Sequence, residues 1–409
     1  MSPADATTSH GPSRRGFLTG SAAAVGVATG AAGGYAAARA VQVDEPRDTT
    51  GANGGRAAAF AGAHQAGITS SPGAHGTFLA FDLVDGSTRD DLRRLMRLWS
   101  DDARRLMAGQ GALADTEPEL AAAPAGLTVT FGWGRAATVL AGGEDAAPAW
   151  LKPLPAFSID ALENRWSDGD LLVMIHADDP VTVSHAARMI TKDAASLAVQ
   201  RWHQTGFRQA YGTHASGTTM RNLFGQVDGT TNPPVAAEEF ARRVWIADGW
   251  LTGGTSFVLR RIRMDLAVWD QVDRIGRENA VGRTLDTGAP LTGTVEHDEP
   301  DLDAVDARGF PIISDVAHLR RARPGEPAQR IVRMGFNYDE PARGGAEAEA
   351  GLLFGSVQAD VDAQFVPIQE RLAQADLLNV WTTPVGSAVF AILPGCSQDG
   401  YLGDGLLEG

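Results

Sequence analysis

Cysteine is almost absent from this chain. Its 409 residues include one cysteine, Cys396, so no internal disulfide can form. A lone cysteine also excludes iron–sulfur clusters and cysteine-rich zinc sites. The fold must therefore be stabilised by its core or by a bound cofactor.

Long apolar runs and an excess of basic residues are missing as well. Beyond the first forty residues no run is long and apolar enough to span a bilayer, so we expect no stable membrane insertion. Lysine and arginine number 35 against 50 aspartates and glutamates, which gives a formal net charge of -15. Such a surface favours solubility and repels nucleic acid, so we expect no nucleic-acid partner. The length of 409 residues predicts two domains or one large double domain.

The N-terminus has the pattern of an export signal. Ser13-Arg14-Arg15-Gly16-Phe17-Leu18 precedes a weakly hydrophobic Ala/Gly-rich run, and Ala38-Arg39-Ala40 forms a small-x-small cleavage site. We predict that residues 1–40 are a twin-arginine signal peptide, which exports a folded protein to the periplasm, cell envelope or extracellular space. A membrane anchor is the alternative, disfavoured by the glycine content. Residues 41–57 are polar and Gly-rich and predict a flexible linker.

The first half of the remaining chain, 58–222, alternates strands and helices. The pattern predicts strands at 77–83, 127–133 and 170–176, and helices from Ser87 to about Met107 and from about Val181 to Val199. This order suits a ferredoxin-like α+β half, with an antiparallel sheet and helices on one face. His64 is interpreted as a hydrogen-bonded structural histidine, because no second ligand lies nearby.

The second half, 223–409, has the same mixture of elements. The pattern predicts strands at 249–263, 332–338, 351–358 and 387–394, and helices at 264–271 and 363–375. We interpret it as a second α+β half of similar size. No repeat is visible in the sequence itself.

One carboxylate of the second half lies in an unusual turn. In Gly225–Pro233, Asp228 is flanked by Gly225 and Gly229, which allow positive φ and a close approach to a flat ligand. An acid on such a turn is poorly solvated on the ligand side and is a candidate proton shuttle. The alternative is a surface turn, since Asp-Gly and Asn-Pro are common turn dipeptides.

A histidine among arginines follows about ninety residues later, in Ser314–Tyr338. His318 is predicted in the middle of a short helix that Ser314 or Asp315 caps, with arginines at 320, 321 and 323 after it. Nearby cations keep an imidazole neutral, which favours metal ligation, and clustered arginines suit porphyrin propionates. A solvated basic helix end is the alternative. Arg333 begins an apolar strand, where an arginine is either paired or directed into a pocket.

In this order, the two segments resemble the dye-decolorising peroxidases, in particular their exported, twin-arginine-dependent group. That group includes the periplasmic haem peroxidase of bacterial iron-uptake operons. The G-x-x-D-G motif is short, but the likeness extends over nearly all of the chain after the leader. It also includes the blocks His64–Gly67, Gly288–Gly293 and Phe365–Gln369.

The resemblance implies a fold, a cofactor and an activity. The fold would be α+β, with two ferredoxin-like halves whose antiparallel sheets pack together, of the dimeric α/β-barrel type. One haem b per chain would lie in the second half. The activity would be reduction of hydrogen peroxide with oxidation of dyes, phenols or other organic reductants. Because the proton on a carboxylate near haem has to be available, we also expect an acidic optimum. The alternatives are a haem-handling protein, such as a deferrochelatase or a haem-iron carrier, and a cofactor-free binding module. A small homo-oligomer is also expected.

The resemblance also implies site residues. Asp228 and Arg333 correspond to the distal acid and arginine, His318 to the iron ligand, Gly229, Thr230 and Thr231 to the turn against the porphyrin, and Arg323 to a polar haem contact. The chain departs from relatives that have Asn-Pro-Arg after the ligand, since it has Arg323-Pro324-Gly325. It has Gly335 where some relatives have a distal asparagine. Glu326 is the predicted hydrogen-bond partner of His318.

Bulky dyes cannot enter a pocket sized for peroxide, so their electrons would have to arrive through oxidisable side chains. Three aromatic residues, Trp381, Tyr338 and Tyr401, are expected in the haem half and are candidates for this transfer. The alternative for each is an ordinary core or surface aromatic.

Overall fold

The computed structural model describes residues 53–215, 217–323, 325–326, 328–342 and 348–409. The predicted signal peptide, 1–40, and residues 41–52 of the predicted linker lie outside this range. The described chain begins inside that linker, where Asn53–Gly55 form one 3-10 turn and Arg56 pairs with Asp178 at 2.6 Å.

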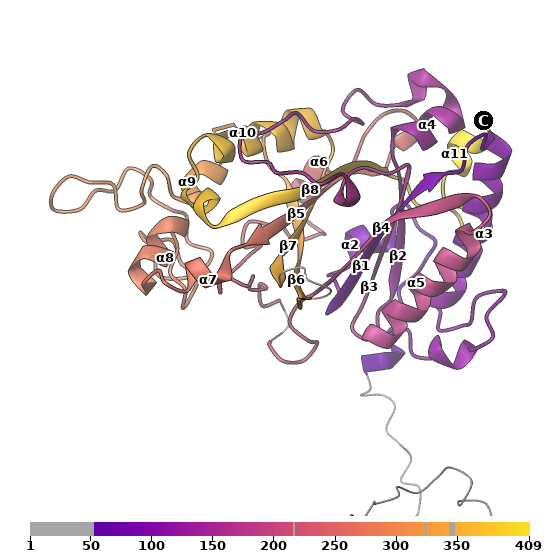
Figure 1. Cartoon of the computed structure of the whole chain (residues 1–409), viewed down its shortest axis with the longest axis horizontal. Coiled ribbons are helices and arrows are strands. Elements are labelled where there is room, and N and C mark those ends of the chain that lie inside the picture. Colours follow the sequence, from indigo (N-terminus) through magenta and orange to yellow (C-terminus); the bar gives the residue numbers. More distant parts are fainter. Residues whose placement is uncertain (1–52, 216, 324, 327, 343–347) are drawn as a thin grey trace, which may run out of the picture. The chain divides into compact units, whose positions relative to one another are not determined.

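Eight strands and ten α-helices make up the described fold (Figure 1). The strands are β1 His75–Leu83, β2 Thr128–Trp133, β3 Leu171–Ala177, β4 Ala198–Phe207, β5 Thr255–Met264, β6 Val332–Glu340, β7 Glu349–Gln358 and β8 Thr382–Ile392. The helices are α2 Ala66–Thr69, α3 Arg89–Met107, α4 Arg135–Gly142, α5 Pro180–Ala194, α6 Glu238–Val244, α7 Leu266–Trp269, α8 Arg274–Val281, α9 His318–Ala322, α10 Val366–Ala375 and α11 Asp404–Leu407. Among the described residues, no helix combines the length and apolar content that a membrane crossing requires.

The strands close into one antiparallel barrel in the order β1-β3-β2-β8-β5-β7-β6-β4. Each half supplies a four-stranded block, β4-β1-β3-β2 and β8-β5-β7-β6, and the two blocks have the same ferredoxin-like order. They join through short ladders, at Gly132↔Ile392 and Trp133↔Ala391 on one side and at Phe207↔Asn337 on the other. The predicted α+β fold of two ferredoxin-like halves is therefore confirmed, and their edges also join.

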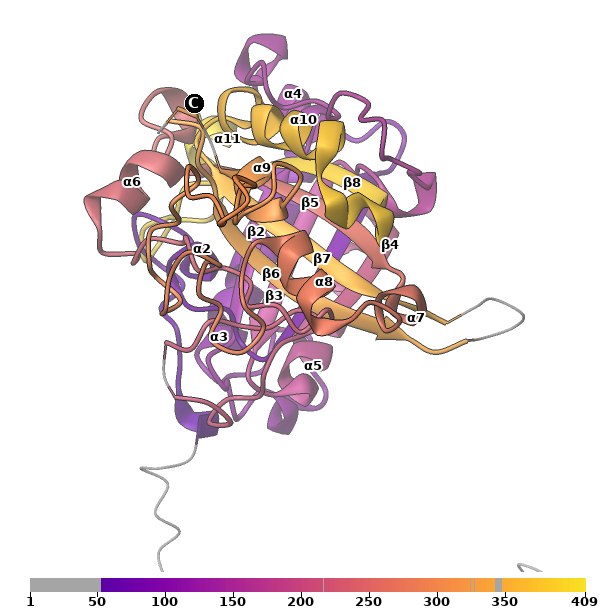
Figure 2. The same cartoon turned by 90° about the vertical axis from the view of Figure 1, so that its left-hand side faces the viewer.

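The interior of the barrel is filled with aromatic side chains. Phe78 stacks on Phe257 with ring centroids 6.2 Å apart and meets the edge of Phe336 at 5.6 Å, while Trp202 meets Phe390. Burying each such ring contributes about 1.5–3 kcal/mol. Because this interior is packed, a ligand has to bind outside the barrel. The helices α3 and α5 cover the first half, while α8, α9 and α10 lie over the second (Figures 1 and 2).

The long helix α3 begins at a capping box. Thr88 Oγ1 accepts from the backbone N–H of Asp91, and the Asp91 carboxylate accepts from that of Thr88. The predicted cap, Ser87, is thus wrong by one residue. His64 is the structural histidine that was expected: it bonds to Gly253 O at 2.7 Å and stacks on Trp245 at 3.7 Å.

Several predicted boundaries are wrong. The helix predicted at 181–199 ends at Ala194, because strand β4 begins at Ala198. The sequence of β4 does not alternate clearly between apolar and polar residues, since the buried position 204 is the polar Gln204. In the second half, β5 begins only at Thr255, after a 3-10 turn at Gly249–Leu251, and the following helix is the single turn α7. The final strand, β8, begins earlier than predicted, at Thr382.

The helix predicted at 363–375 is divided in two. A π-helical turn at Val361–Phe365 precedes α10, which begins at Val366. The helices α6 and α8 were not predicted. They are only seven and eight residues long, which is too short for a clear apolar period.

His176 provides a test of the barrel's packing by pH. Its imidazole is buried beside Thr128 Oγ1, 2.9 Å from Nε2, and burial lowers the pKa of His176 from 6.5 to about 4. A lowered histidine pKa means that its contribution to stability is complete above pH 6.5 and is lost as the pH falls through 4.

We therefore expect the free energy of unfolding of the wild type to fall by about 3 kcal/mol more than that of His176→Gln between pH 7 and pH 4. Urea denaturation at several pH values measures this difference. If the free energy of unfolding fell equally in the two proteins, the lowered pKa of His176 would be contradicted.

Candidate active site

A cavity of about 510 Å³ lies in the second half, outside the barrel. It is enclosed by the turn 225–233, the outer face of β5 and β7, and the helices α9 and α10. Its apolar walls suit a flat hydrophobic ligand, and include Phe224, Leu352, Phe354, Phe365, Ile368 and Leu372.

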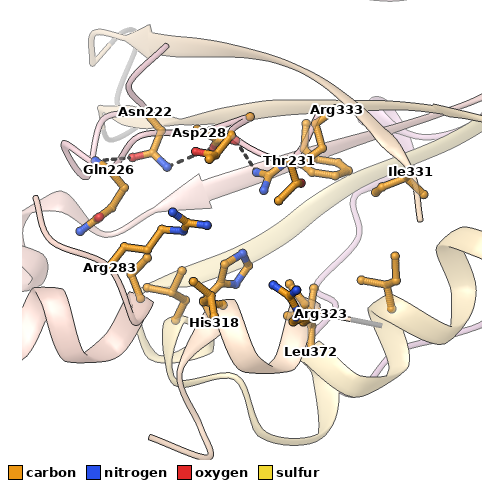
Figure 3. A pocket seen from close by; sticks show the side chains of 18 of the residues that line it. Asn222, Gln226, Asp228, Thr231, Arg283, His318, Arg323, Ile331, Arg333 and Leu372 are labelled. Atoms are coloured by element: carbon orange, nitrogen blue, oxygen red, sulfur yellow. Dashed lines mark hydrogen bonds and ion pairs between the residues drawn. The ribbon is translucent and has the colours of Figure 1, made fainter. Parts of the chain in front are cut away.

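Two charged groups face a histidine across this cavity. Figure 3 shows Asp228 and Arg333 on one side and His318, rising from α9, on the other. The three residues that the sequence indicated as the centre of the chemistry therefore line one cavity.

Asp228 is held in place by its turn and by two side chains. Gly225 has a φ of 79° and Gly229 a φ of 123°, so both glycines adopt the positive φ expected of them. The carboxylate is nearly buried, and its Oδ1 lies 2.5 Å from Arg333 Nη2. Its Oδ2 accepts from Asn222 Nδ2 at 3.2 Å. These contacts fix the position of the carboxylate.

Arg333 lies at the start of β6. Its guanidinium is paired with Asp228 and lies over the ring of Phe354, 5.1 Å from the centroid. Its Nε is buried and has no hydrogen-bond partner among the described residues. Arg333 was expected to be either paired or directed into a pocket, and in the structure it is both.

His318 is the first residue of α9, not a mid-helix residue as predicted. The N-cap is Ala317, which makes no side-chain bond, so the predicted caps Ser314 and Asp315 are wrong. The imidazole Nδ1 lies 2.6 Å from Asp376 Oδ2. With that carboxylate accepting from Nδ1–H, the lone pair of Nε2 is directed into the cavity.

The predicted partner of His318, Glu326, is wrong. Glu326 is exposed, whereas Asp376 is buried and follows the last residue of α10, 58 positions after the histidine. Asp376 also caps the next turn, since its Oδ1 accepts from Leu378 N at 2.9 Å. Nothing in the local sequence around His318 could indicate a partner from the end of another helix.

The predicted turn and rim residues also line the cavity. Gly229, Thr230 and Thr231 belong to the wall that carries Asp228. Arg323 is the C-cap residue of α9 and pairs with Glu299, and burial together with the nearby Arg330 lowers its pKa.

Three further arginines line the cavity without having been predicted, namely Arg243, Arg283 and Arg330. Burial lowers the pKa of the Arg243 guanidinium and of the Arg283 guanidinium. Arg283 Nη1 donates to Gly288 O at 2.6 Å and to Glu296 O at 2.8 Å, so its position is fixed by backbone carbonyls. An isolated arginine carries no pattern that would separate it from a surface residue.

The lining of the cavity fits a haem. Three polar atoms of the lining, Arg333 Nε, Thr230 Oγ1 and Gln226 Nε2, are buried without a hydrogen-bond partner in the described chain. Among the described residues no cluster of three or more His, Cys, Asp or Glu side chains could hold a bare metal ion. The imidazole of His318, apolar walls and arginines of the lining suit a metal that brings a flat, anionic macrocycle with it.

The three aromatic candidates for electron transfer differ in position. Trp381 meets the edge of Trp269 at 5.0 Å, and Trp269 stacks at 4.4 Å on Phe224, which lines the cavity. Tyr338 is buried, donates to Glu349 at 2.9 Å, and has a pKa raised by burial.

Tyr401 is not in the haem half, so that expectation is wrong. It packs into the apolar cluster of the first half, and Arg97 lies over its ring at 5.0 Å. Burial raises the pKa of Tyr401 to about 12. Of the three residues, Trp381 is the one that aromatic contacts connect to the cavity wall.

Comparison with known proteins agrees with this geometry. Residues 65–208 match the family model "Dyp-type peroxidase, N-terminal", and residues 219–397 match "Dyp-type peroxidase, C-terminal". The chain is 36% identical over 428 aligned residues to a dye-decolorizing peroxidase from Thermobifida fusca, an alignment that covers 98% of this chain and 99% of the relative. It is 32% identical to a deferrochelatase from Yersinia pestis, over 97% and 95% of the two chains.

A solved structure shows the same fold. The crystal structure of a DyP-type peroxidase from Cellulomonas bogoriensis superposes with a TM-score of 0.84 at 50% identity, over 87% of this chain and 99% of that one. The family models, these relatives and the closed barrel of two ferredoxin-like blocks agree. The chain therefore belongs to the Dyp-type peroxidase family.

Proposed function

We propose that the cavity binds one haem b per chain, and that the protein reduces hydrogen peroxide while oxidising dyes, phenols or other small or bulky organic reductants. The observation that carries the proposal is the Asp228–Arg333 pair facing His318 across one cavity. Membership of a peroxidase family supports it.

Six residues would hold the cofactor. His318 Nε2 supplies the ligand to the iron, while Gly229, Thr230 and Thr231 lie against the porphyrin. At the rim, Arg323 can pair with a propionate in place of Glu299. Arg333 would contact the porphyrin from the same side as this turn.

When bound, the haem iron supplies the electrons that cleave the O–O bond of peroxide. The protein moves the protons. Asp228, held in place by its pair with Arg333, takes the proton from one peroxide oxygen and returns it to the other. Arg333 provides fixed positive charge for the anion that develops between these transfers. Positioned proton transfer of this kind accelerates a reaction by roughly 100- to 10,000-fold.

Asp376 acts on the opposite wall. Its carboxylate holds Nδ1–H of His318 at 2.6 Å, which fixes both the tautomer and the orientation of the ring. Because Asp376 is buried, its negative charge is poorly screened, which strengthens this hydrogen bond.

A haem-handling role is the second candidate. The similarity to a deferrochelatase at 32% identity favours it, and such a role needs His318 as well. It does not need a paired acid and guanidinium on the other wall, which is why we prefer the peroxidase. A role as a haem carrier and a role as an enzyme can be separated by removing the acid alone.

We also propose export by the twin-arginine pathway, to the periplasm, cell envelope or extracellular space. The support is the Arg14-Arg15 motif and the cleavage pattern at 38–40, which precede the described residues. A small homo-oligomer stays a prediction.

Asp228→Asn tests the peroxidase proposal. The amide keeps the shape of the side chain but cannot accept a proton, so we expect kcat/KM for peroxide to fall by about 100- to 10,000-fold. The visible absorption of bound haem should be retained, since His318 is unchanged. Steady-state assays with a phenol and with a dye measure the loss. A variant that retains wild-type turnover would reject Asp228 as the proton shuttle.

Asp376→Asn tests the proximal pair. We expect haem to bind the haem-free protein about 10- to 100-fold more weakly, because the charge that supports His318 is lost. A haemin titration followed by visible absorption measures the affinity.

The matched control is Asp115→Asn. Asp115 makes a buried pair with His185 at 2.8 Å in the first half, remote from the cavity. This variant should bind haemin as tightly as the wild type. Equal affinities for all three proteins would show that Asp376 does not support the ligand.

A further inference from the structure

A third residue connects the two members of the distal pair. The side-chain amide of Asn232 forms two hydrogen bonds with the backbone of Arg333: Nδ2 donates to Arg333 O at 2.7 Å, and Oδ1 accepts from Arg333 N at 2.8 Å. This is the pattern that a neighbouring strand would make. We call it the Asn232 clamp.

The clamp replaces a missing strand partner. On one side β6 pairs with β7 along its whole length, but its other edge meets β4 only at Phe207↔Asn337. Arg333 lies four residues before that contact, so no strand of the barrel reaches its free backbone groups. A partly buried backbone N–H and C=O without partners would be costly, and the Asn232 amide satisfies both.

Asn232 belongs to the same turn as Asp228. Its backbone N–H donates to Gly229 O at 3.0 Å, which closes the turn directly after the acid. The clamp therefore attaches the segment that carries Asp228 to the strand that carries Arg333. The two segments are about a hundred residues apart in the chain, and the clamp fixes their register.

The Asp228 carboxylate has a hydrogen-bond partner besides Arg333. Among the described residues, the Arg333 guanidinium has no ion-pair or hydrogen-bond partner besides Asp228. The Asp228 carboxylate also accepts from Asn222 Nδ2. The Arg333 guanidinium contacts Asp228 and the face of Phe354, and its Nε has no partner among the described residues. The position of this guanidinium thus depends on where its backbone is held.

From these contacts we propose that Asn232 is a positioning residue for Arg333. Its amide holds the backbone of β6 against the turn so that the guanidinium lies beside Asp228 and above the ligand-binding face of the cavity. The inference rests on the proposed function, because it assigns the clamp to the use of Arg333 toward an anion on that face.

The test uses Asn232→Leu, which preserves the size of the side chain and removes both hydrogen bonds. The main readout is the dissociation constant of cyanide for the ferric, haem-loaded protein, because bound cyanide is an anion that a correctly placed guanidinium stabilises. We expect cyanide affinity to fall by about tenfold or more, the factor that loss of one hydrogen bond to a charged group produces. Asn232→Ala, which leaves room for water beside the Arg333 backbone, should show the same loss if Leu prevents folding.

Gln65→Met is the matched control. The Gln65 amide makes the same kind of clamp in the first half: Nε2 donates to Phe131 O at 2.8 Å and Oε1 accepts from Phe131 N at 2.8 Å. Its loss should lower Tm as much as Asn232→Leu does but leave cyanide affinity unchanged. If both variants lower Tm and neither changes cyanide affinity, the Asn232 clamp is only structural and the proposal is overturned.

A double-mutant cycle separates this inference from the proposed function. In an Arg333→Ala background, Asn232→Leu should change cyanide affinity less than about twofold, because the group that it positions is gone. If Asn232→Leu lowered cyanide affinity by the same factor with and without Arg333, the assignment of Asn232 as a positioning residue would be overturned. Failure of the wild type to bind haem or turn over peroxide would instead reject the proposed function.

Discussion

The site depends on an ion pair between a buried carboxylate and a partly buried guanidinium. Asp228 and Arg333 come from distant parts of the chain, yet their charged atoms lie 2.5 Å apart on one wall of an apolar cavity. In such surroundings each charge is stabilised mainly by the other, so neither residue would be well placed alone. The His318–Asp376 pair repeats this arrangement on the opposite wall. The cavity lies between the two pairs, so a ligand bound there would meet Asp228 and Arg333 on one side and His318 on the other.

The duplicated fold explains where this space can form. Both halves use the same strand order, and the barrel interior between them is filled by aromatic rings. The outer face of the first half is covered by α3 and α5, of 19 and 15 residues. The second half has the shorter helices α9 and α10, of 5 and 10 residues, and the turn 225–233 in their place. One half therefore stabilises the barrel, while the other can enclose a ligand.

The sequence predicted the fold class and brought attention to the residues that line the cavity, because Asp228, His318 and Arg333 lie in motifs with local patterns. It failed where the information is long-range. Asp376 contacts His318 from the end of another helix. Strand β4 was missed because one of its buried positions is a glutamine, which interrupts the apolar–polar alternation. Tyr401 belongs to the second half in sequence but packs on the first. In each case the contact depends on how distant segments pack, and a local sequence pattern does not predict this packing.

The central claim is that His318 binds the iron of a single haem in this cavity. Titration of haem-free wild type and His318→Ala with haemin, followed by absorption at roughly 400 nm, tests it most directly. We expect saturation at one haem per wild-type chain, and weak binding with an altered spectrum for the variant. Equal stoichiometry, affinity and spectrum in the two proteins would contradict it.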